Sequence, residues 1–195
     1  MLASPMDYTA EIERAVLAYR ESNNVAELLE RLSAIAEGAD PERLRAAVAP
    51  WRDIPEVAGP IYERIVATCP DDAQALVILA NAYWLAGRGP DAVGELATRA
   101  MAADPANRGA WHLWALSEPS LRERMMRWHQ VSERFPTDDL ARANLADNAA
   151  SLASTEHDRE ALQVALRNYK ALLATASHPE QRAALEQAVS VLEQW

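Results

Sequence analysis

The clearest structural pattern in the chain lies between Ala73 and Pro105, AQALVILANAYWLAGRGPDAVGELATRAMAADP. In its first half, apolar residues recur at i, i+3, i+4 and i+7, a spacing that places four side chains on one face of an α-helix. Those residues are Leu76, Leu79, Ala80 and Tyr83. Gly89-Pro90 then has the form of a helix cap followed by proline in the first turn of a second helix. The stretch therefore predicts two consecutive helices joined by a short turn.

The same spacing recurs along the chain at nearly even intervals. Three first members, Ile12, Leu44 and Leu76, lie 32 residues apart. A fourth copy begins 35 residues later at Trp111, and a fifth begins after another 31 residues at Arg142. Two-helix repeats have periods of about 34 residues, so the spacing predicts about five helical hairpins. The further copies are Ile12, Ala15, Val16 and Tyr19; Leu44, Ala47, Val48 and Trp51; Trp111, Trp114 and Ala115; and Arg142, Leu145, Ala146 and Ala149.

Polar residues and prolines mark the expected helix starts. Five short polar side chains are followed three positions later by Glu or Gln, as in capping boxes, and three other sites place proline after Asp or Gly. These sites are Asn24, Asp53, Asp71, Ser120 and Ser177, with Asp40-Pro41, Gly89-Pro90 and Asp104-Pro105. They predict helices over approximately 7–22, 24–37, 41–51, 55–69, 72–86, 90–103, 105–117, 120–135, 138–153, 156–176 and 178–195. Residues 1–6 are expected to form a flexible N-terminus.

The composition is typical of an all-α chain. Half of the residues are hydrophobic but only 6% are aromatic, and the apolar count is mostly Ala and Leu, which favour helix. Six glycines in the whole chain leave little material for strands and hairpin turns. We expect no β-sheet.

The segment 73–105 resembles a tetratricopeptide repeat. The resemblance is carried by the apolar stripe of its first helix, by Gly87 at the turn, by Ala100 late in the second helix, and by Asp104-Pro105 at its close. Half-repeats on either side extend the resemblance over about residues 55–117. It implies an α-α superhelix, a helical solenoid in which each hairpin buries its inner face against its neighbours.

The resemblance also implies how the chain is organised. We expect residues 7–195 to form a single repeat domain, with its best repeat at 73–105. A solenoid needs end caps with one polar face, and the segment 178–195 fits this role. Its apolar stripe consists of Leu185, Ala188, Val189 and Leu192.

Proteins of this type bind a peptide or a helix in a concave groove lined by the first helix of each hairpin. On this chain, the groove is expected to include Asn81, which would hydrogen-bond a peptide backbone, and Trp84, which would offer an apolar plate. The full set of candidate partner-binding residues is Arg45, Val77, Asn81, Trp84, His112, Ala143 and Asp147. Val77 stands where the members that grip acidic chaperone tails carry lysine, so tail binding is not expected.

Charge and cysteine content limit the partner classes. A net charge of −10 disfavours nucleic acid and anionic membranes, which need a clustered basic face. The single cysteine, Cys69, forms no internal disulfide, and neither a secretory signal nor a membrane span is evident. We expect a cytoplasmic protein that binds neither nucleic acid nor membranes.

A search for catalytic chemistry finds no phosphate-binding glycine loop, nucleophile elbow, HExxH or CxxC. His112 lies near Met125 in the expected hairpin, but adaptable core filling is the better interpretation of the methionines. We therefore expect no catalytic residue, no cofactor and no metal. The cluster of Trp111, Trp114 and Trp128 has two interpretations, a buried core and a binding hot spot.

Three functional hypotheses follow. The first is a non-enzymatic adaptor or assembly factor that binds another protein, through a peptide or helix, in the groove. An alternative is a homo-oligomeric structural or regulatory subunit in which exposed Trp or the last helix forms the contact. A metal-binding protein or an enzyme using the Trp/His region is the remaining alternative.

Overall fold

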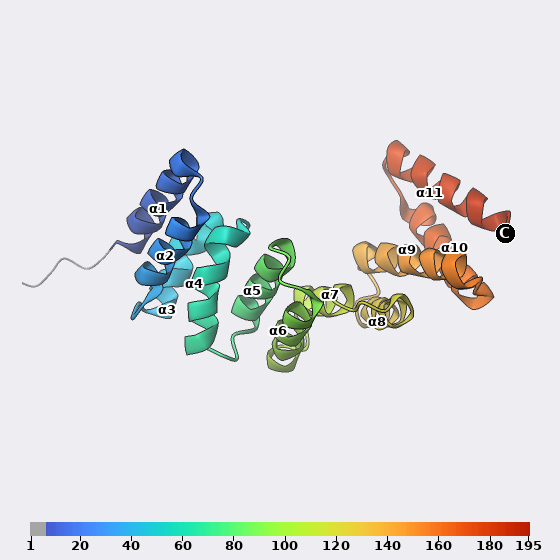
Figure 1. Cartoon of the computed structure of the whole chain (residues 1–195). Coiled ribbons are helices and arrows are strands. Elements are labelled where there is room, and N and C mark those ends of the chain that lie inside the picture. The colour runs from blue at the N-terminus through green and yellow to red at the C-terminus, as the bar shows by residue number, and fades with distance from the viewer. Residues whose placement is uncertain (1–6) are drawn as a thin grey trace, which may run out of the picture. The chain divides into compact units, whose positions relative to one another are not determined.

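A computed structural model describes residues 7–195, so the expected flexible N-terminus, residues 1–6, lies outside the described residues. The described chain is all-helical, as predicted, and contains no strand (Figure 1). Its elements are α1 (Tyr8–Ser22), α2 (Val25–Ala36), α3 (Pro41–Val48), the 3-10 turn η1 (Ala49–Trp51), α4 (Pro55–Thr68), α5 (Ala73–Leu85), α6 (Pro90–Ala103), α7 (Arg108–Leu116), α8 (Leu121–Arg134), α9 (Asp139–Glu156), α10 (Arg159–Thr175) and α11 (Pro179–Glu193).

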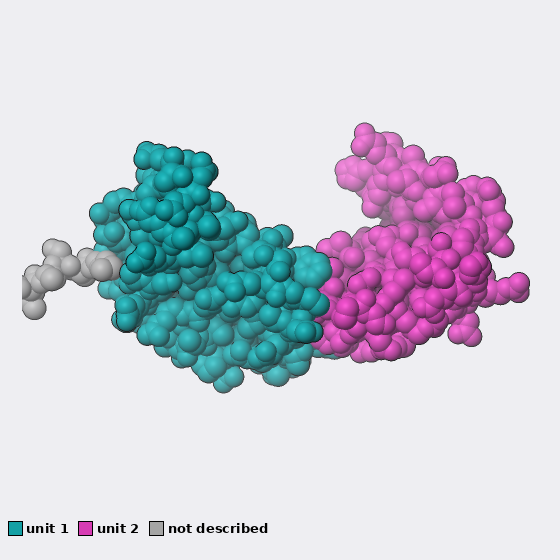
Figure 2. Space-filling model, viewed as in Figure 1, with its two compact units in different colours: residues 1–113 teal, residues 114–195 magenta. Residues whose placement is uncertain are grey.

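The chain divides into two compact units, residues 1–113 and 114–195 (Figure 2). In the first unit, α1 packs on α2, α3 on α4 and α5 on α6, so that consecutive helices form hairpins. Neighbouring hairpins stack because α1 also packs on α3, α2 on α4 and α4 on α5. Fully buried apolar side chains fill the spaces between them. They include Ile12, Leu28, Leu32, Leu44, Ile61, Ile65 and Leu76.

In the second unit, each helix from α8 to α11 packs on the next along the chain. Its core is formed largely by α9, which buries Leu145 and Leu152 completely or nearly so. Alanines let the neighbouring helices approach closely, and the buried ones on α9 and α10 are Ala141, Ala146, Ala149, Ala153, Ala161 and Ala165. The apolar stripes that the sequence places at repeat spacing therefore line the interiors of both units.

Several helix starts follow the predicted local chemistry. The Asn24 side chain accepts from the Glu27 N–H, Asp40 from Arg43 and Ser120 from Glu123. Each carbonyl or hydroxyl oxygen satisfies a backbone donor that the first turn of a helix leaves unpaired. Gly87, with φ of 68°, adopts the left-handed conformation that ends α5, a conformation that glycine tolerates best.

Other predicted starts are wrong. Asp104-Pro105 does not begin a helix: Asp104 terminates α6 and its carboxylate accepts from the Ala106 N–H, while α7 begins only at Arg108. Asp53 and Ser177 do not cap either, because the cap positions are Ile54 and His178, which make no side-chain cap hydrogen bond. At both sites a proline occupies the first helical position, where its fixed φ favours the start of the helix.

The start of α5 differs by one residue from the prediction. Asp72, and not Asp71, accepts from the Ala75 N–H at 2.9 Å.

None of the helices within residues 7–195 combines the length and apolarity that crossing a bilayer requires.

Candidate functional site

The candidate residues of α5 have different environments. Val77 is half-buried, and its Cγ1 lies so near Gly109 of α7 that a Cβ built there would be 3.1 Å away. Asn81, one turn further along, is exposed, and Trp84 leaves 40% of its surface exposed. A glycine at position 109 thus permits the close approach of α7, and the open surface of α5 consists of the residues towards its C-terminus.

Arg45 of α3 is engaged within the first unit. Its guanidinium donates to the carboxylate of Asp72, the N-cap residue of α5, and lies 3.6 Å from Glu42. Burial alone would raise the pKa of the Asp72 carboxyl, but hydrogen bonds from Arg45 and from the Ala75 N–H outweigh this and lower that pKa below its ordinary value. Arg45 therefore ties α3 to the start of α5.

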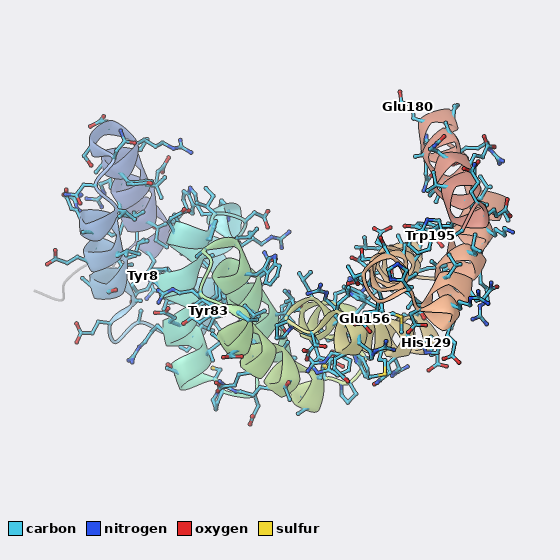
Figure 3. The ribbon with its side chains drawn as sticks, turned by 45° about the vertical axis from the view of Figure 1, so that its right-hand side comes forward. Tyr8, Tyr83, His129, Glu156, Glu180 and Trp195 are labelled. Carbon is cyan, nitrogen blue, oxygen red and sulfur yellow. The ribbon has the colours of Figure 1, made fainter. Side chains whose placement is uncertain are left out.

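Tyr83 lies where α5 faces α4 (Figure 3). Its hydroxyl donates to Glu63 at 2.8 Å, and the guanidinium of Arg88 lies 5.3 Å from the ring centroid. The ring is half-buried, although its position in the apolar stripe suggests full burial. Tyr83 therefore connects two helices at the edge of the core. Replacing it by alanine should accordingly cost less than the roughly 3–5 kcal/mol of a buried aromatic.

Burial and the hydrogen bond to Glu63 raise the pKa of Tyr83 to about 12. Because the folded-state pKa lies above the ordinary value of 10.0, the stabilisation is present below pH 10 and is lost as the pH rises towards 12. We expect ultraviolet titration of tyrosinate to show a component near pH 12 that Tyr83→Phe removes, while Tyr169, whose pKa is also raised, still ionises late. In Glu63→Gln, which replaces the charged acceptor by a neutral one, this component should ionise earlier. An unchanged titration curve in both variants would contradict the assignment.

The second unit contains a groove of about 480 Å³ between α9, α10 and α11. The α11 helix packs mainly against α10, and the groove separates it from α9 (Figure 1). Two predicted groove residues of α9, Ala143 and Asp147, line it. The structure adds Asp139, Leu140, Tyr169, Leu172, Gln181, Ala184, Leu185 and Ala188 to the lining.

The apolar part of this groove is open to solvent. Leu140 leaves 60% of its surface exposed although it immediately follows the first residue of α9. Opposite, α11 buries little: among its residues only Val189 is buried, and Leu185 and Ala188 are half-buried. Figure 3 places Glu180 at the start of this helix and Trp195 just beyond its end. The apolar stripe of α11, predicted to cap the end of the solenoid, is therefore only partly buried.

The polar part of the groove is held in place by Tyr169. Its hydroxyl donates to Oδ1 of Asp147 at 2.6 Å, which connects α10 to α9. Burial and this hydrogen bond to a carboxylate raise the pKa of Tyr169, so it remains a donor at neutral pH. Asp139 at the mouth is 61% exposed and lies 3.3 Å from Arg142.

Sequence reasoning missed the α10 and α11 walls. It placed the groove residues only on the first helix of each hairpin. Tyr169 and Leu172 instead belong to α10, the second helix of its hairpin, and the remaining wall comes from the capping helix α11. A usable signal was present in Leu140, a large apolar residue outside the predicted stripe of Leu145, Ala146 and Ala149.

The tryptophans of the fourth hairpin are not equivalent. Trp128 is buried in the second unit, which supports the core interpretation for this residue. Trp114 is half-buried, with the Arg127 guanidinium 4.6 Å from its ring centroid. In the first unit, Trp111 donates from Nε1 to the carbonyl of Pro105 at 3.0 Å, and His112 beside it is half-buried. Within residues 7–195, no group of three or more His, Cys, Asp or Glu side chains is placed to hold a metal ion.

Comparison with solved structures identifies the architecture. TTC0263, a thermophilic TPR protein in Thermus thermophilus, aligns over 93% of this chain and 98% of its own, with a TM-score of 0.55 and 17% identity. The fold is the tetratricopeptide type. A MamA protein shares this tetratricopeptide-type fold over 89% of this chain and 99% of its own, with a TM-score of 0.60 and 15% identity. MamA from Desulfovibrio magneticus RS-1 aligns over 89% and 100%, with a TM-score of 0.58 and 15% identity.

At such identities the likeness concerns the fold alone. No protein-family model matches the sequence, and no curated protein matches it. The tetratricopeptide-type fold explains the hairpin stacking of both units. The groove beside α9 has to be interpreted from its own residues.

Proposed function

We propose that this protein is a non-catalytic adaptor or assembly factor that binds a peptide or helix of another protein. The observation that carries the proposal is the groove between α9 and α11, which exposes Leu140 beside the expected contacts Ala143 and Asp147. A contiguous apolar surface rimmed by polar groups is characteristic of a protein-binding site. Here such a surface lies between two helices of the second unit, where a further helix could pack.

The exposed end of α5, in the first unit, is a second and separate candidate binding surface. Trp84 and Leu85 leave 40% and 57% of their surfaces exposed, and Asn81 supplies a hydrogen-bonding amide next to them. Large aromatic residues contribute disproportionately at protein interfaces. Because Cys69 forms no internal disulfide, a reducing cytoplasm suits the chain, and we include this setting in the proposal.

Leu140→Gln should abolish capture of the partner without unfolding the protein. Leu140 is exposed and glutamine is a good helix former, so helicity should be unchanged, whereas loss of an apolar anchor at an interface centre costs about 2 kcal/mol, or some thirty-fold in affinity. Immobilised wild-type and variant proteins would be compared by quantitative mass spectrometry of what they retain from a cell extract.

The matched control is Leu17→Gln, the same change at an exposed leucine on α1 of the first unit, outside both proposed binding surfaces. A partner held through the groove should be retained by this control and lost with Leu140→Gln. Equal retention by both variants would show that the groove does not bind it. Asn81→Ala combined with Trp84→Ala tests the α5 surface in the same way.

The homo-oligomeric alternative is favoured by a different observation. Val191 and Trp195 leave 46% and 60% of their surfaces exposed at the end of the chain. A second copy that covered them would make the molar mass rise with protein concentration in light scattering, and Trp195→Gln would abolish the rise.

A further inference from the structure

We propose that the groove between α9 and α11 selects an amphipathic helix carrying two basic residues about 12 Å apart with an apolar residue midway between them. This inference rests on the proposed protein-binding function and names the class of partner that the groove accepts. It follows from the placement of charge and apolar surface along α9.

The spacing comes from one face of α9. Asp139, Ala143 and Asp147 are four residues apart and all line the groove, so they form a single stripe along the helix. Eight residues of α-helix rise about 12 Å, which sets the separation of the two carboxylates along the groove. The small side chain of Ala143 leaves room between them for an apolar group of the partner.

The charge of the occupant follows from the lining. Among the described residues that line the groove, the ionisable acids are Asp139 and Asp147, and no Lys or Arg is present. Arg142 partly offsets Asp139 from outside the lining. Asp147 accepts from a neutral donor, the hydroxyl of Tyr169, and this contact brings no opposite charge to the carboxylate. A bound acidic peptide would be repelled, and a basic one attracted.

The apolar requirement follows from the walls. Leu140 on α9 and Leu185 and Ala188 on α11 face the groove, with Leu172 beneath them. A helix laid between α9 and α11 would contact Leu140, Leu185 and Ala188, in the manner of amphipathic helices that bind in grooves through anchors on one face. It would also cover the α11 stripe, of which α10 alone buries only part.

The test uses three fluorescently labelled, end-capped alanine-rich helical peptides of about four turns. The first carries two lysines eight positions apart and a leucine midway; the second replaces the lysines by glutamines; the third replaces them by glutamates. Fluorescence polarisation with the full-length protein should rank the affinities lysine, glutamine, glutamate. Raising the salt from low to physiological concentration should reduce the difference between them.

The variant that tests the charges is Asp139→Asn combined with Asp147→Asn. Asparagine at position 147 keeps an acceptor for Tyr169, so the fold should persist, as circular dichroism would check. We expect about a ten-fold loss of affinity for the lysine peptide and no loss for the glutamine peptide. The matched control, Glu186→Gln on the exposed face of α11, should bind the lysine peptide as the wild type does.

The other possible results of these experiments contradict different parts of the proposal. Equal binding of the lysine and glutamine peptides, both lost in Leu140→Gln, would refute the basic partner and leave the protein-binding groove intact. Absence of binding by all three peptides would refute the helical basic partner, and the capture experiment with Leu140→Gln would then decide the adaptor function separately. Concentration-dependent self-association abolished by Leu140→Gln would identify a second copy as the occupant and overturn the proposal.

Discussion

Leu145→Ala is expected to lower the free energy of unfolding of the second unit by about 2–5 kcal/mol, because it removes a buried side chain and leaves a cavity. Leu145 is 2% exposed in the middle of α9, on the face opposite the groove stripe. Chemical denaturation followed by circular dichroism would measure the loss.

The position of that loss is as informative as its size. Helical-repeat proteins are stabilised by contacts between neighbours, so a defect weakens nearby hairpins most. Hydrogen exchange in Leu145→Ala should show reduced protection within residues 114–195 and little change in α1 to α4. Leu76→Ala, which truncates a fully buried leucine of α5, should produce the converse pattern. Equal loss throughout the described chain in both variants would show that the two units unfold as one.

Asp72→Ala is expected to destabilise the first unit by about 2.5–4 kcal/mol. The change removes the N-cap of α5, worth about 1 kcal/mol. It also removes the closer of the two carboxylates beside the partly buried guanidinium of Arg45, worth about 1.5–3 kcal/mol. The side chains of Arg45 and Asp72 are 28% and 20% exposed, so solvent screens this pair only in part. Thermal and denaturant unfolding would measure the effect.

Asp72→Asn separates the two contributions, because asparagine still caps a helix but carries no charge. Since the pKa of Asp72 is lowered in the folded protein, its charge stabilises the fold above the unfolded-state pKa of about 3.9. That stabilisation is lost as the pH falls through the lowered folded-state pKa. The wild type and Asp72→Asn should therefore differ in stability at neutral pH and converge in acid. A difference that persists unchanged in acid would rule out the charge of Asp72 as its source.

Much of the fold was predictable because its causes are local. The first three members of the stripes that begin at Ile12, Leu44 and Leu76 are buried, and the aromatic fourth member of each is half-buried. The caps at Asn24, Asp40 and Ser120 form from residues three positions apart. The wrong predictions concern helix starts, where neighbouring residues compete for the capping position. The Asp104 carboxylate accepts a hydrogen bond from the N–H of Ala106, two residues further along the chain. This turn delays the start of α7 until Arg108.

The candidate site was less predictable because exposure is decided by distant segments. Arg45 was expected in a groove, but its guanidinium is paired with Asp72, twenty-seven residues along the chain. Val77 was expected there as well and lies against Gly109. Asn81, Trp84 and Asp147 remain exposed, and whether they contact a partner is what the proposed experiments decide.

The helical hairpins, their order and most of their buried faces follow from the amino-acid sequence alone, because helical periodicity and a capping side chain act within one or two turns. Only the tertiary structure decided that a groove opens between α9 and α11. That opening depends on α11 packing against α10 and away from α9, which is set by packing between helices and not by the periodicity within any one helix. It is also what leaves Leu140 exposed beside two carboxylates.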